Sequence, residues 1–258
     1  MIQQDLHMHS AFSDGRNTAE EMVLSAIEKG LTVVGLSDHS RSPQDPDTMP
    51  FERYPSYRAE VARLKEQYRG QITVLCGIEQ DLDTENPPEG FDYVIGSVHF
   101  LRRDGEDVYV DWSPEKTADA VSRLYSGDAL SYCEHYYSQV AKWASVPCDI
   151  VGHFDLVTKF NERLPLIDTA HPRYIAAWRK AADALLAAGR VFEINTGAIS
   201  RGWRTSPYPS PEILAYLKAH GARFVLSSDS HSAANIAFQF DQFASLAADR
   251  LVQFPLVK

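Results

Sequence analysis

Cysteine is scarce in this chain. Only Cys76, Cys133 and Cys148 occur among 258 residues, an odd number spaced too widely for a CxxC metal site or a disulfide framework. We expect all three to be small buried hydrophobic side chains rather than metal ligands. This cysteine usage is typical of the reducing cytoplasm.

Long hydrophobic runs and an excess of positive charge are also missing. No apolar stretch approaches the roughly 18–20 residues that span a bilayer. Met1–Asp5 has neither the basic start nor the apolar core of an export signal, so we expect no export. The net charge is −10, which repels phosphate backbones and argues against duplex nucleic acid as the main partner. The remaining class is a globular, cytoplasmic protein with a small-molecule partner.

Repeats, low-complexity tracts and Gly/Ser linkers are absent too, so we expect residues 1–258 to form a single domain. Short apolar runs alternate with helical stretches, which predicts a parallel sheet covered on both faces. Seven such units favour a closed (β/α) barrel over an open sheet. The predicted strands are 2–9, 32–37, 72–79, 93–100, 148–153, 191–195 and 224–228. The predicted helices are 18–29, 56–68, 114–125, 129–143, 173–188, 211–220 and 233–248.

Two segments interrupt this alternation. Residues 40–55 follow the second strand and are rich in proline, and residues 196–211 follow the sixth strand. Loops of this length in a compact domain are usually functional. We expect the first to act as a lid and the second to bind substrate.

Histidine or an acidic residue lies at the end of every predicted strand, where (β/α) barrels place their chemistry. These residues are Asp5, His7, His9, Asp38, His39, Glu79, His99, His153, Glu193, Asp229 and His231. Each has an ordinary explanation by itself, as a hydrogen-bonded histidine, a helix cap or half of an ion pair. The presence of such a residue at the end of every predicted strand has no ordinary explanation of this kind.

The spacing of His7 and His9 lets both side chains reach one ion, because residues i and i+2 of a strand point the same way. Imidazole with carboxylate suits Zn²⁺, Mn²⁺ or Fe²⁺. About nine ligands, with Asp14 included, exceed what one open metal site uses, so the sequence predicts two or three divalent ions.

These strand-end motifs resemble those of the PHP (polymerase and histidinol phosphatase) family. The matching segments are Asp5–Ser10, Ser37–Ser40, Gly77–Glu79, Ser97–Phe100, Val151–Phe154 and Ser228–His231. Within the family the chain is most similar to the monofunctional histidinol-phosphate phosphatases. The segments that carry this narrower resemblance are Gly77–Asp81, Gly96–Phe100, Tyr132–Tyr137 and Gly152–Leu156.

The resemblance implies a distorted (β/α)₇ barrel with its metal site at the carboxyl ends of the strands. It assigns the first metal to His7, His9, Glu79 and Asp229. Glu79 would bridge to a second metal held by His99 and His153, and His39, His231 and Asp14 would hold a third. Asp14 has an alternative interpretation as a turn residue, because Ser13-Asp14-Gly15 is a good β-turn signal. We favour the interpretation of Asp14 as a metal ligand.

The implied reaction is hydrolysis of a phosphate monoester by a metal-bridging hydroxide, with Glu79, Asp229 and His231 as the catalytic residues around it. The expected substrate is L-histidinol phosphate, giving L-histidinol and phosphate in histidine biosynthesis. One alternative is a PHP phosphatase or exonuclease acting on nucleotides or oligonucleotide ends. Another is a non-catalytic PHP scaffold, although such modules should have lost ligands and none is missing here. Nothing in the sequence indicates an oligomer, so we expect a monomer.

The neighbouring residues suggest supporting roles. Asp38, Ser10 and Ser228 would hydrogen-bond to the metal ligands. A phosphate also favours an arginine, and Arg201 matches a phosphate-binding position of the family. Lys159 and Arg204 are further candidates, which we rather interpret as solvated loop charges. Asp81 or Asp83 could bind the substrate amine, although loop carboxylates are common.

Overall fold

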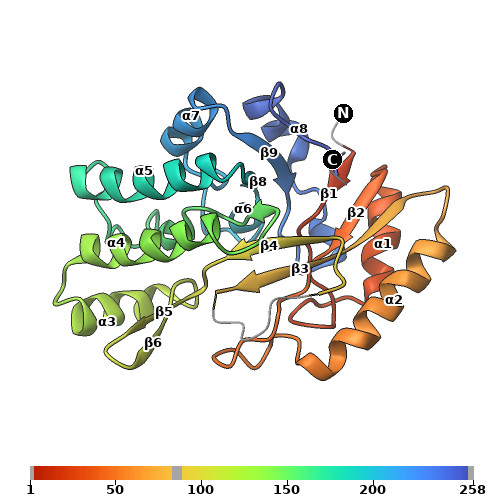
Figure 1. The fold of residues 1–258 in the computed structure, drawn as a ribbon, viewed down its shortest axis with the longest axis horizontal. Coiled ribbons are helices and arrows are strands. Elements are labelled where there is room, and N and C mark those ends of the chain that lie inside the picture. The colour runs from red at the N-terminus through yellow and green to blue at the C-terminus, as the bar shows by residue number, and fades with distance from the viewer. Residues whose placement is uncertain (1–2, 83–88, 255–258) are drawn as a thin grey trace.

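The computed structural model describes residues 3–82 and 89–254, and it places seven parallel strands side by side in one curved sheet (Figure 1). Their order is β1-β2-β3-β4-β7-β8-β9, which confirms the predicted (β/α)₇ barrel. The strands are β1 (Gln4–Asp5), β2 (Val33–Leu36), β3 (Thr73–Asp81), β4 (Tyr93–Ser97), β7 (Ile150–Val151), β8 (Val191–Asn195) and β9 (Arg223–Ser227).

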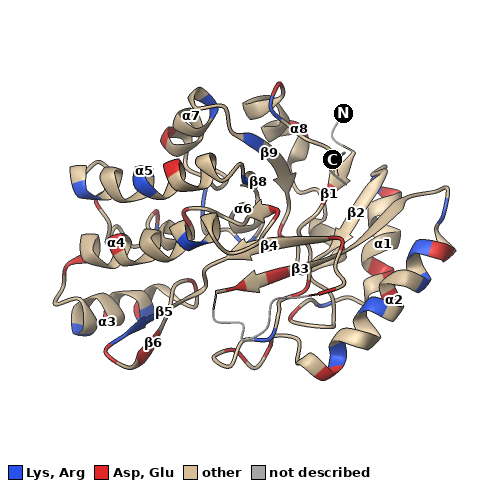
Figure 2. Cartoon of the chain, in the orientation of Figure 1, with Lys and Arg blue, Asp and Glu red and all other residues tan. Residues whose placement is uncertain are grey.

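Helices follow the strands and most of them pack on the outside of the sheet, whereas the short α6 lies at the carboxyl end of the barrel, next to Asp229. They are α1 (Ala19–Glu28), α2 (Tyr54–Gln67), α3 (Pro114–Leu124), α4 (Ala129–Val140), α5 (Pro172–Ala187), α6 (Gly197–Ser200), α7 (Pro211–Ala219) and α8 (Phe240–Phe243). Charged residues of both signs lie along the outer helices such as α2 and α5, and acidic positions also occur on β3 (Figure 2). Among the described residues, no helix is long and apolar enough to cross a membrane.

The start of α1 shows how local sequence fixes a helix. The side chain of Thr18 accepts a hydrogen bond from the Glu21 backbone, and the Glu21 side chain accepts one from the Thr18 backbone. This capping box satisfies two backbone donors that the helix itself leaves free. The buried face of α1, which includes Met22 and Val23, then packs into the core with α2.

The last predicted helix, 233–248, is wrong. The segment consists of two short 3₁₀ helices, Ala233–Asn235 and Ala244–Ala247, on either side of the four-residue α8. Ala237 and Gln239 both have positive φ angles, which a right-handed helix does not allow. The backbone N–H of Ala237 instead donates to the buried carboxylate of Asp5, so contact with the barrel overrides helix propensity here.

A β-hairpin was missed by the sequence analysis. β5 (Phe100–Arg103) and β6 (Glu106–Tyr109) pair in antiparallel fashion beside the barrel. Asp104 and Gly105 form the turn between them, both with positive φ. Asp-Gly flanked by strand-forming residues is a strong hairpin signal because this tight turn requires that conformation twice.

The barrel closes unevenly between β1 and β9. At the carboxyl end, the His9 backbone N–H donates to the Ser230 carbonyl at 2.8 Å. At the opposite end, the last described segment of the chain lies between β1 and β9. There the Val252 backbone N–H donates to the Phe224 carbonyl at 2.9 Å. The barrel is therefore distorted, and its closed seam holds the first and last metal-ligand motifs next to each other.

The three cysteines are free. Cys133 and Cys148 are buried as we predicted, whereas Cys76 is only partly buried.

Two glycines make room for an aromatic ring inside the barrel. Tyr93 on β4 is buried, and its hydroxyl donates to the Leu6 carbonyl at 2.5 Å. A Cβ atom at Gly35 on β2 or at Gly77 on β3 would overlap the Tyr93 side chain. The ring therefore packs directly against the backbone of the two glycines, and its hydroxyl links β4 to the end of β1 across the barrel interior.

We predict that Gly35→Ala lowers the free energy of unfolding by about 1–3 kcal/mol, because it overpacks this contact. Urea denaturation measures the loss. The atom nearest to the new Cβ is the Tyr93 hydroxyl. In a Tyr93→Phe background the same substitution should therefore lower the free energy of unfolding by less. An equal loss of free energy in both backgrounds would contradict the proposed overlap.

Candidate metal centre

The predicted ligands come together at the carboxyl end of the barrel. His7 and His9 follow β1 and His39 follows β2, while Glu79 lies on β3. The others come from the ends of β4, β7 and β9 and from the turn after β1; they are His99, His153, Asp229, His231 and Asp14.

Glu79 lies at the centre of this cluster and is 1% exposed. Its Oε2 is 3.1 Å from His7 Nε2 and 3.1 Å from His39 Nδ1. Its Oε1 is 2.9 Å from His153 Nε2. One carboxylate thus faces imidazoles from three parts of the barrel, as the bridging interpretation requires.

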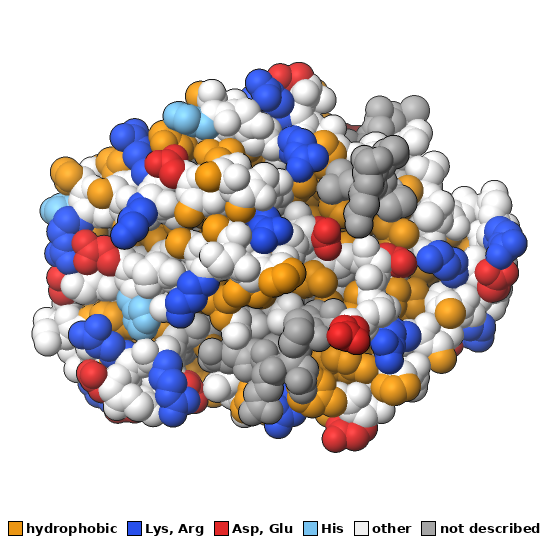
Figure 3. Space-filling model, in the orientation of Figure 1, with side chains coloured by type: hydrophobic (Ala, Val, Ile, Leu, Met, Phe, Trp, Pro, Cys, Tyr) orange, Lys and Arg blue, Asp and Glu red, His pale blue; other side chains and the backbone are white. Residues whose placement is uncertain are grey.

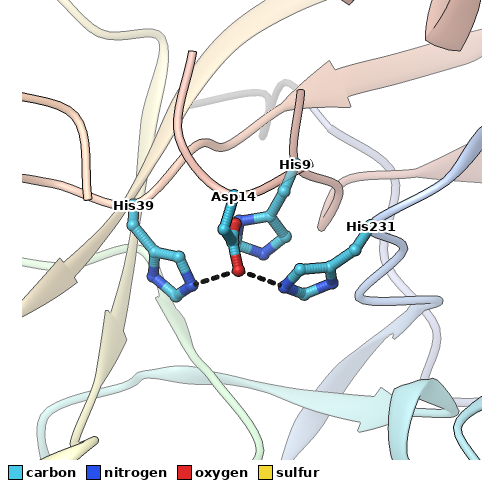
Figure 4. Close-up of side chains that lie close together, drawn as sticks. All are labelled: His9, Asp14, His39 and His231. Atoms are coloured by element: carbon cyan, nitrogen blue, oxygen red, sulfur yellow. Dashed lines mark ion pairs between the residues drawn. The ribbon is translucent and has the colours of Figure 1, made fainter. Parts of the chain in front are cut away.

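Asp14 joins the cluster from the turn after β1 (Figure 4). Its Oδ2 lies 2.9 Å from His231 Nε2 and 3.8 Å from His39 Nε2, and its Oδ1 lies 3.4 Å from His9 Nδ1. The side chains of these residues point toward one another. This placement favours the ligand over the simple turn residue.

The ligand atoms form overlapping groups within 4.8 Å. The groups are His9, Asp14, His39 and His231; His7, His153 and Asp229; His7, His9 and Glu79; and His39, Glu79 and His99. They differ from the sets implied by resemblance at three points, the first being that His153 groups with His7 and Asp229 rather than with Glu79 and His99. His9 also approaches the Asp14 group, and His39 also approaches the group of Glu79 and His99.

The cluster fits divalent ions by its own chemistry. His7 Nε2, both ring nitrogens of His9 and Glu79 Oε2 are buried and have no hydrogen-bond partner. Leaving such atoms unsatisfied is costly, so a buried site normally supplies a partner. Nitrogen and oxygen ligands about 2.1 Å from an ion lie roughly 3–3.5 Å from each other. The contacts of Glu79 Oε2 with His7, His9 and His39, at 3.1 to 3.5 Å, match this spacing.

Three further residues contact these ligands. Asp81 Oδ2 is 2.8 Å from His99 Nδ1, and Glu193 Oε1 is 2.7 Å from His7 Nδ1. The Ser97 hydroxyl donates to Glu79 Oε1 at 2.6 Å. Our sequence analysis gave no role to Glu193 or Ser97. The available signal for Glu193 was an acidic residue in the middle of an apolar strand.

Asp81, which we predicted as an amine contact, faces His99 and also lines the cavity above the cluster. Its Oδ1 accepts from the His99 backbone N–H at 2.8 Å while its Oδ2 faces the His99 ring. Both oxygens are thus engaged, which favours orientation of His99 over binding of a substrate amine. The other predicted amine contact, Asp83, lies outside the described residues.

Asp38 holds a loop rather than an imidazole. Its Oδ1 accepts hydrogen bonds from the backbone N–H groups of Ser10 at 2.9 Å and Ser13 at 3.0 Å. This fixes the turn that carries Asp14. The backbone N–H of Ser228 donates to Asp5 at 3.1 Å, so this residue supports the seam. Asp38, Ser10 and Ser228 therefore act on the backbone around the ligands, whereas we predicted contact with the ligands themselves.

The charges of the cluster are strongly coupled. Burial opposes ionisation of Glu79, but the imidazoles of His7 and His39 overcome it and hold the pKa of Glu79 well below its usual value. Burial also disfavours a charged His99, yet Asp81 and Glu79 raise the pKa of His99 to about 10. Without a metal, Glu79 is thus ionised and His99 retains its proton, so a divalent ion that binds His99 must displace that proton.

A cavity of about 400 Å³ opens above the cluster. Both predicted loops contribute to its wall, the first through Asp45, Asp47 and Thr48 and the second through Arg201. Its base includes Asp14, His39, Glu79, His99, His153, Asp229 and His231. The centre is therefore accessible to a small molecule.

The predicted phosphate-binding residues divide into two groups. Arg201 and Lys159 line the cavity, where Arg201 Nη2 donates to Asp229 Oδ2 at 2.9 Å and Lys159 Nζ donates to Asp111 Oδ2 at 2.8 Å. Arg204 does not belong to the lining; it is buried, and its Nη1 donates to the Thr158 hydroxyl. Arg204 is thus neither a phosphate ligand in this arrangement nor the solvated charge that we favoured.

Known proteins resemble this chain over most of its length. The PHP domain family model matches residues 5–197. A protein of Deinococcus radiodurans named "Probable histidinol-phosphatase" is 30% identical over 251 residues, which cover 92% of this chain and 89% of that protein. The histidinol-phosphatase of Bacillus subtilis is 26% identical, over 94% of this chain and 98% of its own length.

A solved structure shares the fold. It is the histidinol phosphate phosphatase of Lactococcus lactis complexed with zinc, L-histidinol and phosphate, with a TM-score of 0.75. The match covers 96% of this chain and 93% of that chain at 22% identity.

We predict that Glu79→Gln lowers the number of tightly bound zinc ions by at least one per chain. A neutral amide keeps the shape of the side chain but cannot bridge two cations. Elemental analysis after dialysis against a fixed free zinc concentration measures this number. Glu134→Gln, which changes an exposed carboxylate paired with Arg173, is the matched control and should retain all ions. Equal metal content in both variants would refute a bridging Glu79.

Proposed function

Since the chain belongs to the PHP family, we propose that it is a metal-dependent phosphate monoester hydrolase acting on L-histidinol phosphate. It would convert L-histidinol phosphate and water into L-histidinol and phosphate, a step of histidine biosynthesis. The observation that carries this proposal is the buried cluster around Glu79 at the base of an accessible cavity. Relatives named histidinol-phosphatase match over nearly the whole chain.

The centre would hold two or three ions of Zn²⁺, Mn²⁺ or Fe²⁺, since imidazole and carboxylate ligands suit all three metals. Zinc is present in the relative from Lactococcus lactis. We assign His7, His9, Glu79 and Asp229 to one ion, Glu79, His99 and His153 to a second, and Asp14, His39 and His231 to a third. When bound, such ions supply an activated water and neutralise phosphoryl oxygens.

Glu79, Asp229 and His231 remain our catalytic residues. All three line the cavity base, so they would meet the phosphoryl group. Arg201 holds Asp229 by two nitrogens, Nη1 donating to its backbone carbonyl and Nη2 to its Oδ2, while the buried Nε has no hydrogen-bond partner. A phosphate oxygen entering here would satisfy this donor with a charge-assisted hydrogen bond. Lys159, which is paired with Asp111 on the same wall, is a second contact for phosphate.

The outer wall of the cavity suits the other end of the substrate. Asp45, Asp47 and Asp111 supply carboxylates there, and Tyr109 and Trp112 supply aromatic rings 4.6 Å apart in an edge-to-face arrangement. A protonated amine and a flat imidazole are attracted by both kinds of group. These residues therefore replace Asp81 in our proposal for recognition of the substrate amine.

Nucleotides and oligonucleotide ends fit less well. On the face shown in Figure 3, Lys and Arg side chains are scattered among acidic and apolar ones rather than gathered along a groove. Single-stranded nucleic acid usually needs a basic groove with aromatic platforms. A non-catalytic scaffold is also disfavoured, because all nine predicted ligands converge. We further propose that the protein acts as a monomer in the cytoplasm, on the grounds of its cysteine usage and acidic charge.

Phosphate release from a substrate panel tests the proposed function. The zinc- or manganese-loaded protein should hydrolyse L-histidinol phosphate with a kcat/KM at least 100-fold above that for nucleoside monophosphates and sugar phosphates. Elemental analysis of the same sample reports the ions per chain. Activity confined to nucleotides would contradict the proposed substrate. A metal-loaded protein without phosphatase activity would contradict the proposed reaction.

Arg201→Ala should raise KM for L-histidinol phosphate roughly tenfold or more, because a charge-assisted hydrogen bond to phosphate contributes about 1.5–3 kcal/mol. Steady-state kinetics at saturating metal measures the change. Arg163→Ala is the matched control, since Arg163 contacts the Gly202 carbonyl in the same loop but does not line the cavity. If both variants keep the original KM, Arg201 does not bind phosphate.

A further inference from the structure

Glu193 is a buried acidic residue for which the reaction has so far no use. It lies on β8 between the buried apolar residues Phe192 and Ile194 and is 1% exposed. A carboxylate in such a place must be compensated by hydrogen bonds. Three donors provide them: His7 Nδ1 at 2.7 Å, the His153 backbone N–H at 2.9 Å and Asn195 Nδ2 at 3.0 Å.

The contact with His7 determines which ring nitrogen is free. An ionised carboxylate only accepts hydrogen bonds, so His7 Nδ1 must carry the hydrogen. In the neutral ring the lone pair then resides on Nε2. This atom is 3.1 Å from Glu79 Oε2 and 3.9 Å from Asp229 Oδ1, and it has no hydrogen-bond partner.

Glu193 contacts the backbone of His153 rather than its ring. Glu193 Oε2 fixes the N–H of His153, whose own Nε2 lies 2.9 Å from Glu79 Oε1. The carboxylate therefore reaches ligands on both sides of β8, one after β1 and one after β7. Asp81, by comparison, serves a single ligand, His99.

We propose that Glu193 is a positioning residue for two ligands of the metal centre. It holds His7 in the tautomer that offers Nε2 to the metal, and it fixes the backbone from which His153 projects. This inference rests on the proposed metal centre but not on the identity of the substrate.

Glu193→Gln tests the proposal because no orientation of the amide preserves all three contacts. If the amide oxygen faces His7, the amide nitrogen meets the His153 N–H, and two donors collide. If the oxygen faces His153, the nitrogen meets His7 Nδ1, and the ring must shift its hydrogen to Nε2, which cannot then bind metal.

We expect zinc affinity to fall about 10–100-fold, the usual effect of losing such an orienting partner. Competition with a chromophoric chelator measures it. The matched control is Glu162→Gln, an exposed carboxylate that accepts from the Thr205 backbone, and it should bind zinc as the original protein does. In a His7→Ala background, Glu193→Gln should cost less affinity than it costs alone. Unchanged affinity, or the same cost in both backgrounds, would overturn the role at His7.

A second measurement needs no variant and covers the case in which Glu193→Gln fails to fold. In zinc-loaded protein with ¹⁵N-labelled histidine, NMR should show His7 with hydrogen on Nδ1 and metal on Nε2. Metal on Nδ1 would overturn the proposal. If the protein bound no metal, the proposed function would fail by itself, and the tautomer of His7 in the metal-free protein, at a pH high enough for its ring to be neutral, would still test Glu193: hydrogen on Nδ1 alone supports its role and hydrogen on Nε2 alone contradicts it.

Discussion

The structure depends on the mutual compensation of charges packed around Glu79. Imidazoles from three strand ends approach one buried carboxylate, and several of their nitrogens have no hydrogen-bond partner in the protein. Buried groups of this kind are costly to keep without a partner. Divalent ions would provide that partner in the proposed metal centre, and one end of the barrel holds the predicted ligands in place.

The surrounding structure shows how this arrangement is held. Asp38 fixes the turn that presents Asp14, and Asp81 and Glu193 fix imidazoles. The seam between β1 and β9 brings the ligands of the first and last motifs together by backbone hydrogen bonds. Glu79 contacts the imidazoles directly, and the other buried, hydrogen-bonded carboxylates hold the ligands and the turn around them in place. Rigid placement matters here because metal affinity depends on the orientation of each ligand.

Much of this could be predicted from the sequence. The convergence of the ligands follows from two rules, the same-side orientation of residues i and i+2 and the common edge formed by parallel strand ends. Both act through the backbone and need no knowledge of neighbouring side chains. The barrel itself followed from apolar strands alternating with helices, and the Thr18–Glu21 capping box from a purely local pattern.

What could not be predicted depends on contacts across the barrel. The roles of Asp81 and Glu193 are set by which imidazole lies opposite each carboxylate, and that follows from the register of neighbouring strands rather than from any local motif. Arg204 pairs with a buried partner that lies 49 positions earlier, Asp155. The segment after β9 is broken because its backbone binds Asp5, more than 200 positions away. Two local signals were overlooked: the Asp104-Gly105 turn of the hairpin and the acidic Glu193 within an apolar strand.

The most direct test of this account is a crystal structure of the zinc-loaded protein with anomalous diffraction measured at the zinc edge. The account predicts two or three anomalous peaks within about 2.0–2.3 Å of the assigned nitrogen and oxygen atoms. Two of them should share Glu79. A cluster without peaks, in which Glu79 contacts only protonated imidazoles, would contradict it.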